Sequence, residues 1–279
     1  MVDYNPKDWS AFIFKMHKAD TVQKLLPMLI YIAVYSGVVV FLLHQFLPTN
    51  LISYCEKLTI MHTLLGFVIS MLLVFRTNTA YDRWWEGRKV WGSLINTSRN
   101  LLLKFTTQIS NPTIVKQLSE TVVEFAEALK IHLNKGKGTK HTSHLPLTTT
   151  YNMYNQVCAL HKNALINDIQ FLTLNNDIQL LMDYTGMCER IKNTPIPFIY
   201  SMFIKKFIFI YVMTLPFALG FNLSYLTVPV SVFIFYVLAS LETIAEEIED
   251  PFGEDSNDLP LQNYVRIIEK SKIELLVKL

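Results

Sequence analysis

The sequence FIFIYVMTLPFALGFNLSYLTVPVSVFIFYVLASL occupies Phe207 to Leu241 and contains no Asp, Glu, Lys, Arg or His. A helix needs about 20 mostly apolar residues to cross the hydrocarbon core of a bilayer. This stretch is therefore too long for one untilted span. The polar residues Asn222 to Tyr225 near its middle provide a turn, so we expect two crossings joined by a short hairpin. One crossing here, with three spans in the chain and an external carboxyl terminus, is the alternative.

Two further uncharged stretches precede this one. Leu25 to Leu43 has no charged residue, and Leu58 to Phe75 contains one titratable side chain, His62. Only 17% of the chain is charged, against roughly one quarter in average soluble proteins. A signal peptide is the alternative for the first stretch, but the stretch is long and no small-residue cleavage site follows it. We therefore predict an all-α membrane protein with four transmembrane helices.

The distribution of basic residues predicts the orientation of these spans. Residues 1–24 contain several lysines, and basic residues recur directly after the second stretch, at Arg76, Arg83, Arg88 and Lys89. The link His44 to Lys57 has one lysine and one glutamate. Because loops rich in Lys and Arg stay in the cytoplasm, we expect both termini to be cytoplasmic, in a multi-pass protein of the inner (plasma) membrane.

The predicted spans divide the chain into five segments. These are a cytosolic amino-terminal segment (1–24), the first two spans (25–76), a large cytosolic helical region (77–206), the last two spans (207–245), and an acidic loop with a carboxyl-terminal helix (246–279). In the cytosolic region, apolar residues recur every three or four positions from Leu118 to Leu133, which is typical of an amphipathic helix. The polar stretch Asn134 to His144 separates two helical blocks.

One face of the second span carries three large apolar side chains. Phe67, Met71 and Phe75 are spaced at i, i+4 and i+8, so they share one face of a helix. Such a stripe commonly packs against a neighbouring helix or lipid. If several subunits surround an axis, the same residues instead form stacked apolar rings, which can close a pore by excluding water. The spacing alone is compatible with both interpretations.

Three motifs follow one another along the chain. The first combines Phe75-Arg76-Thr77-Asn78 with Tyr81-Asp82-Arg83-Trp84-Trp85-Glu86. The second runs from Cys188 to Tyr200 and includes Thr194-Pro195-Ile196-Pro197, and the third is Glu247-Ile248-Glu249-Asp250-Pro251-Phe252-Gly253. In this order they resemble the signature of the bestrophins, in their prokaryotic branch. The resemblance covers nearly the whole chain.

The resemblance implies a homopentameric channel that passes monovalent ions (chloride or sodium) through a single axial pore. By this resemblance Phe67, Met71 and Phe75 line a hydrophobic neck, and methionine is a mild departure from the Ile or Phe common in the family. Ile196 matches a second, cytosolic constriction. The residues support this assignment, because the prolines on either side of Ile196 interrupt a helix. A simple turn before the third span is the alternative.

The third motif continues into an acidic loop. Four acidic residues lie between positions 250 and 258 beside a glycine turn, and Ca²⁺ prefers such hard oxygen ligands. In calcium-gated bestrophins the corresponding loop binds Ca²⁺, and the matching positions here are Glu247, Asp250, Asp255 and Asp258. Two uncharged residues interrupt the acidic run, and prokaryotic members do not reliably bind calcium there. A solvated loop that pairs with Arg or Lys is the alternative, so Ca²⁺ is a candidate ligand and no cofactor is required.

Other sequence features give weaker signals. His132, His141 and His144 cluster near a polar loop, and His141 and His144 are three residues apart. A metal site at this pair needs a third ligand and none is evident, so we expect surface histidines. The three cysteines are widely separated and predict neither a disulfide framework nor a metal site.

The alternatives to a channel are a membrane transporter and a membrane-embedded enzyme of unknown chemistry. No GxSxG, HExxH or intramembrane pair of aspartates is present, so we do not expect an enzyme. A net charge of +2 also gives no reason to expect nucleic acid as a partner.

Overall fold

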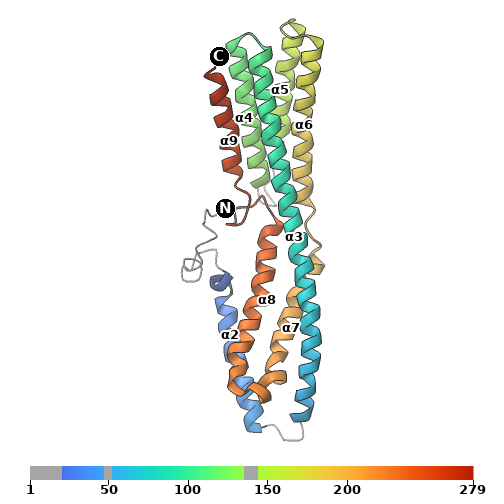
Figure 1. Ribbon diagram of the computed structural model, residues 1–279, viewed down its shortest axis with the longest axis vertical. Coiled ribbons are helices and arrows are strands. Elements are labelled where there is room, and N and C mark those ends of the chain that lie inside the picture. Colours follow the sequence, from blue (N-terminus) through green and yellow to red (C-terminus); the bar gives the residue numbers. More distant parts are fainter. Residues whose placement is uncertain (1–20, 47–51, 135–143, 279) are drawn as a thin grey trace. The chain divides into compact units, whose positions relative to one another are not determined.

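The computed structural model describes residues 21–46, 52–134 and 144–278, and all regular structure in these residues is helical. The elements are α2 (Thr21–Phe46), α3 (Ile52–Gln108), α4 (Pro112–Asn134), α5 (Leu145–Lys162), α6 (Asp168–Asn193), α7 (Phe198–Leu223), the 3₁₀ turn η2 (Ser224–Leu226), α8 (Thr227–Glu249) and α9 (Leu261–Leu276) (Figure 1). This confirms the predicted all-α class. The predicted amino-terminal segment 1–24 lies mostly outside the described residues.

The described chain forms two compact units. We call residues 21–82 with 195–249 the apolar unit, and residues 83–194 with 250–278 the amphipathic unit. Helix α3 is continuous for 57 residues and contributes to both. The predicted segment boundary at 76/77 therefore falls within a helix.

The core of the apolar unit comes from α2, the first part of α3, α7 and α8. Helix α2 packs against α7 and α8, which also pack against each other. Ile32, Ile69, Ile208 and Val212 are among the residues buried between them. Large apolar side chains are also exposed around this unit, for example Val34 at 63%. A soluble protein rarely exposes so continuous an apolar surface.

Three described stretches are long and apolar enough to cross a membrane, namely Thr21–Phe46, Lys57–Gln108 and Asp168–Glu249. The third includes both α7 and α8. Helix α7 ends and α8 begins on either side of η2, at the polar residues where the sequence predicts a turn. Ser224 adopts a left-handed conformation there, with φ of 48°, which is uncommon for a residue other than glycine.

The amphipathic unit has a separate core, centred on α4. This helix packs against α5, α6 and α9. Its apolar stripe, predicted from Leu118 to Leu133, is buried against the other helices, and Phe125 is fully inaccessible. Helix α6 begins with a reciprocal cap, in which Asn167 and Gln170 each accept a hydrogen bond from the other's backbone N–H at 2.8 Å.

We expect the Phe125→Ala substitution to destabilise this core by roughly 3–5 kcal/mol, because it leaves a cavity that the rigid bundle fills only in part. The thermal unfolding midpoint in detergent, followed by tryptophan fluorescence, measures the effect. Leu147→Ala in α5 is the control, since its side chain is 54% exposed. Equal midpoints for the two variants would contradict the assignment of α4 to the core.

Candidate functional site

The apolar stripe on α3 is exposed in the isolated chain. Phe67, Met71 and Phe75 have 72%, 45% and 56% of their surface accessible, whereas Ile69 and Leu73 on the opposite face are 1% exposed. The chain's own described helices therefore do not cover the stripe. Lipid, another copy of the chain and a water-filled pore are environments that such an uncovered apolar face could meet. The structure also extends the exposed stripe upstream to Ile60 and Leu64, which the sequence analysis did not include.

A buried arginine directly follows the stripe. Arg76 is 1% exposed, and its Nη2 donates to Glu249 Oε2 at 2.6 Å, while its Nε lies 3.6 Å from Glu242 Oε2. Glu242 is almost as inaccessible, at 3%. A charge held out of water needs such partners, because desolvation otherwise costs several kcal/mol. The base of the α3 stripe is thus fixed to the last turns of α8.

The same glutamate holds the predicted constriction residue. Glu249 Oε1 accepts the backbone N–H of Ile196 at 2.7 Å. Ile196 lies in the irregular link between α6 and α7, where the prolines at 195 and 197 prevent a continuous helix. One carboxylate therefore links Arg76 to the backbone of Ile196. Sequence reasoning did not single out Glu249 from the other acidic residues of the third motif, since its two partners are distant along the chain.

The other acidic residues near the end of α8 also have basic partners. Glu247 forms an ion pair with Lys24, and Glu246 pairs with Lys205 at 2.8 Å. These pairs relieve the unfavourable interaction of carboxylates with a helix carboxyl terminus. The structure thus places the predicted calcium ligand Glu247 in an ion pair within the apolar unit.

The acidic loop of the amphipathic unit is closed by its own hydrogen bonds. Asp258 is 3% exposed, and its Oδ2 accepts the backbone N–H of Asp255 at 2.6 Å. The backbone N–H of Asp258 in turn donates to the Asp255 carbonyl at 3.1 Å. A Cβ on Gly253 would lie 2.7 Å from Asp258 Oδ2, so a larger residue here would displace the Asp258 carboxylate.

Residues from the first motif support the loop. The indole Nε1 of Trp84 donates to the Asn257 carbonyl at 3.0 Å, and Phe252 packs against Gly87 of α3. A cavity of about 270 Å³ lies beside the loop, with Asp255, Asp258 and Lys130 in its wall.

The loop fits calcium only in part. Asp255 is exposed and Asp258 is close by, but Ca²⁺ takes about six to eight oxygen ligands. Glu247 is held by Lys24, and the Lys130 ammonium in the cavity wall opposes a second cation. Asp250 is exposed at the start of the loop. Of the four predicted ligands, the structure brings the side chains of Asp255 and Asp258 together on one loop.

His62 has an internal structural role. Its side chain is 5% exposed, its Nδ1 lies 3.0 Å from the Leu58 carbonyl, and its Nε2 lies 2.9 Å from Thr214 Oγ1. Because a carbonyl only accepts, Nδ1 carries the proton. The ring also stacks at a tilt on Tyr211, with 5.4 Å between centroids.

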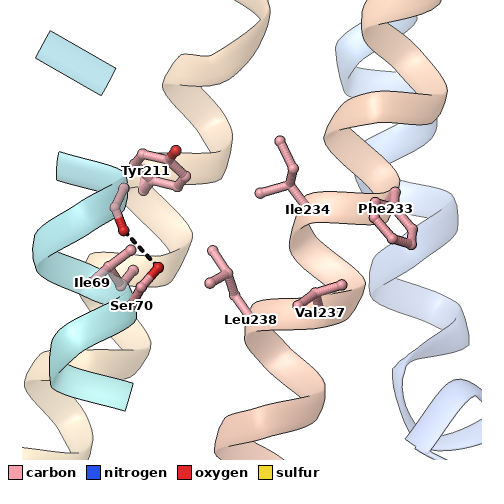
Figure 2. A pocket seen from close by; sticks show the side chains of 8 residues that line it. Ile69, Ser70, Tyr211, Phe233, Ile234, Val237 and Leu238 are labelled. Carbon is pink, nitrogen blue, oxygen red and sulfur yellow. Dashed lines mark hydrogen bonds between the residues drawn. The ribbon is translucent and has the colours of Figure 1, made fainter. Parts of the chain in front are cut away.

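A pocket of about 310 Å³ lies nearby, between α3, α7 and α8. Figure 2 shows Ile69 and Ser70 of α3 across the gap from Ile234 and Leu238 of α8, with Tyr211 of α7 on the α3 side. A Cβ on Gly66 would lie 2.8 Å from Tyr211 Oη, so glycine lets this tyrosine approach α3. The Ser70 hydroxyl is bonded within its own helix, to the Gly66 carbonyl at 2.7 Å. The pocket is consequently an apolar gap between helices, with no charged side chain in its wall.

Two of the three histidines near the polar loop lie in the described part of the chain. His132 and His144 lie close together in the amphipathic unit, with ring centroids 4.5 Å apart, whereas His141 lies outside the described residues. Cys158 and Cys188 are free thiols, and the side chain of Cys55 is not among those described.

Relatives with assigned names share nearly the full length of this chain. The voltage-dependent anion channel-forming protein YneE of Escherichia coli is 30% identical over 96% of this chain and 91% of its own length. A voltage-dependent anion channel-forming protein of a Nostoc species is 34% identical over 82% of each chain.

Solved structures of bacterial proteins are also similar to this chain. A bacterial bestrophin homologue from Klebsiella pneumoniae superposes with a TM-score of 0.79 and 27% identity, covering 90% of this chain and 98% of its own. The sequence profile described as Bacterial/Fungal Bestrophin protein matches residues 1–274. The resemblance carried by the three motifs is thereby confirmed, and the chain belongs to the bacterial and fungal bestrophin family.

Proposed function

We propose that this chain forms a homopentameric channel that conducts monovalent ions, chloride or sodium, along a single axis through the inner membrane. Its relatives are named as anion channel-forming proteins. The observation that carries the proposal is the exposed apolar stripe on α3, which no described helix of the chain covers. In this arrangement α2, the first part of α3, α7 and α8 cross the bilayer, and both termini are cytoplasmic.

The stripe supplies the neck of the proposed pore. Five copies of Phe67, Met71 and Phe75 around an axis form three stacked apolar rings, and such a constriction gates by excluding water. Methionine is flexible and polarizable, so the middle ring adapts its width more readily than a ring of phenylalanine. The rings bear no charge and do not select the sign of the ion.

Ile196 supplies the second constriction. It is half-buried in the isolated chain, and its backbone is held by Glu249, which also binds Arg76 at the base of the neck. Both proposed constrictions therefore share one anchor. A displacement of the end of α8 moves the backbone of Ile196 and the arginine that follows Phe75 together.

The neck assignment predicts that alanine at Phe67, Met71 and Phe75 together raises single-channel conductance or open probability in planar bilayers. The physical reason is that a wider and less apolar ring is easier to wet. The control is the pair Ile30→Ala and Val34→Ala, which truncates exposed apolar residues of α2 instead. Native mass spectrometry should report pentamers for all three proteins. Well-folded pentamers that do not conduct would contradict the channel, and monomers would favour a transporter or an enzyme.

Because the neck rings are uncharged, we expect the same triple variant to keep the ion preference of the wild type. The measurement is the reversal potential in asymmetric NaCl, whose sign also distinguishes chloride from sodium. A reversal potential that changes sign in the variant would show that the neck selects the ion.

The shared anchor predicts that Glu249→Gln lowers stability by about 3–5 kcal/mol, because it leaves the buried Arg76 undercompensated. The substitution also weakens the tether on Ile196, so open probability should change. Glu246→Gln is the matched control, as it breaks an ion pair on the same helix whose partners are 50% and 58% exposed and is worth less than about 1 kcal/mol. Similar unfolding midpoints and gating in the two variants would remove the proposed role of Glu249.

Calcium binding at the acidic loop is a second proposal for this site, supported by the carboxylates of Asp255 and Asp258. We expect an affinity of about 10⁻⁴ M or weaker, because the ion must compete with the Asp255 N–H for Asp258 Oδ2. Calorimetric titration with CaCl₂ measures it, with Asp255→Ala expected to abolish the heat and Glu254→Ala, a neighbouring exposed residue, to retain it. No heat in the wild type would leave the loop with a purely structural role.

A further inference from the structure

Two histidines and one glutamate from three helices meet in the amphipathic unit. His132 lies in the last turn of α4, His144 directly precedes α5, and Glu189 lies in α6. The Nε2 atoms of both histidines lie 2.7 Å from the same oxygen, Glu189 Oε1. The sequence analysis found no third ligand near the histidines, because Glu189 follows His144 by 45 residues.

This cluster has the composition and convergence of a metal site. The three ligand atoms lie within 4.8 Å of one another, and among the described residues this is the one group of three or more His, Cys, Asp or Glu that converges in this way. Zinc is bound by two histidines and a glutamate in some known sites, with Zn–N and Zn–O distances of about 2.0–2.2 Å. Tetrahedral coordination at those distances separates the ligand atoms by about 3.3 Å. Each Nε2 atom now lies 2.7 Å from Glu189 Oε1, so small side-chain movements bring these ligand atoms to the separation that zinc requires.

We propose that His132, His144 and Glu189 bind a zinc ion, with water in the fourth position. The site is independent of the proposed channel activity. The three side chains are 28%, 34% and 30% exposed, so an ion has access from solvent and room remains for a water ligand. Two neutral imidazoles and one carboxylate leave a net charge of +1 on the occupied site.

Neighbouring groups hold the ligands but do not compete for the ion. Lys192 donates to the backbone carbonyls of His132 and Leu133, which fixes the end of α4. Cys188 is adjacent to Glu189 in sequence, but it is fully buried and is not one of the three converging groups.

Zinc binding has a structural consequence at the start of α5. His144 Nδ1 accepts the backbone N–H of Leu147 at 3.1 Å and thereby caps this helix. The proton of the neutral ring is therefore on Nε2. When Nε2 binds the metal, that proton is displaced and the ring carries its proton on Nδ1, facing the Leu147 N–H. Zinc thus replaces a helix cap by a link from α5 to α4 and α6.

The test is calorimetric titration of the untagged, chelator-treated full chain in detergent with ZnCl₂. We expect one zinc per chain in the wild type, and affinity at least about tenfold weaker in His132→Ala, His144→Ala and Glu189→Gln. His161→Ala is the matched control, because His161 Nε2 also lies 2.7 Å from a carboxylate, Asp168 Oδ1, but has no second histidine. This variant should bind zinc like the wild type.

Two further measurements separate zinc binding from effects on folding. Zinc should raise the thermal unfolding midpoint of the wild type but not of Glu189→Gln, and Co²⁺ should give the intense visible absorption of a tetrahedral site in the wild type only. No stoichiometric binding in the wild type, or equal binding in all four variants, would overturn the proposal and leave a hydrogen-bonded cluster. Because none of these readouts involves ion flux, their failure is distinguishable from a failure of the channel proposal.

Discussion

The buried pair between Arg76 and Glu249 is the constraint on which the apolar unit depends. Arg76 cannot reach water, so its charge is tolerated only where Glu249 and Glu242 meet it. This requirement sets the register of α3 against α8, because Arg76 must lie beside both glutamates. With Arg76 turned inward, Phe67 lies on the opposite face of α3 and Phe75 about 100° around the helix, and both are exposed. The Arg76–Glu249 ion pair thus sets the orientation of the apolar stripe on α3.

Features of this chain that depend on local spacing could be predicted from sequence, and those that depend on distant pairing could not. The uncharged runs, the turn before α8 and the stripe at i, i+4 and i+8 are all visible within a short window. The Arg76–Glu249 pair joins residues 173 positions apart, and Glu249 stood among several acids of equal appearance. Likewise, two neighbouring histidines indicated little until folding placed Glu189 between them.

Composition alone also left the acidic loop ambiguous for a physical reason. A carboxylate serves equally well as a ligand of calcium and as an acceptor of backbone N–H groups, and the same short loop offers both uses. The structure shows the second use at Asp258, whose oxygen closes the turn onto Asp255 in the space left by Gly253. The acids of α8 have a third use, because Lys24 and Lys205 neutralise them. Acidic residues that look alike in sequence therefore have different structural roles, although they lie only a few positions apart.

The order of these residues along the chain places the acidic loop directly after the residue that holds the backbone of Ile196, the proposed constriction. Asp250 begins the loop and is bonded covalently to Glu249, whose two oxygens hold Arg76 and the backbone of Ile196. The residue whose carboxylate pairs with the buried arginine is thus the residue that immediately precedes the loop. The position of the loop next to Glu249 follows from the order of the chain, whereas the two contacts of Glu249 follow from folding.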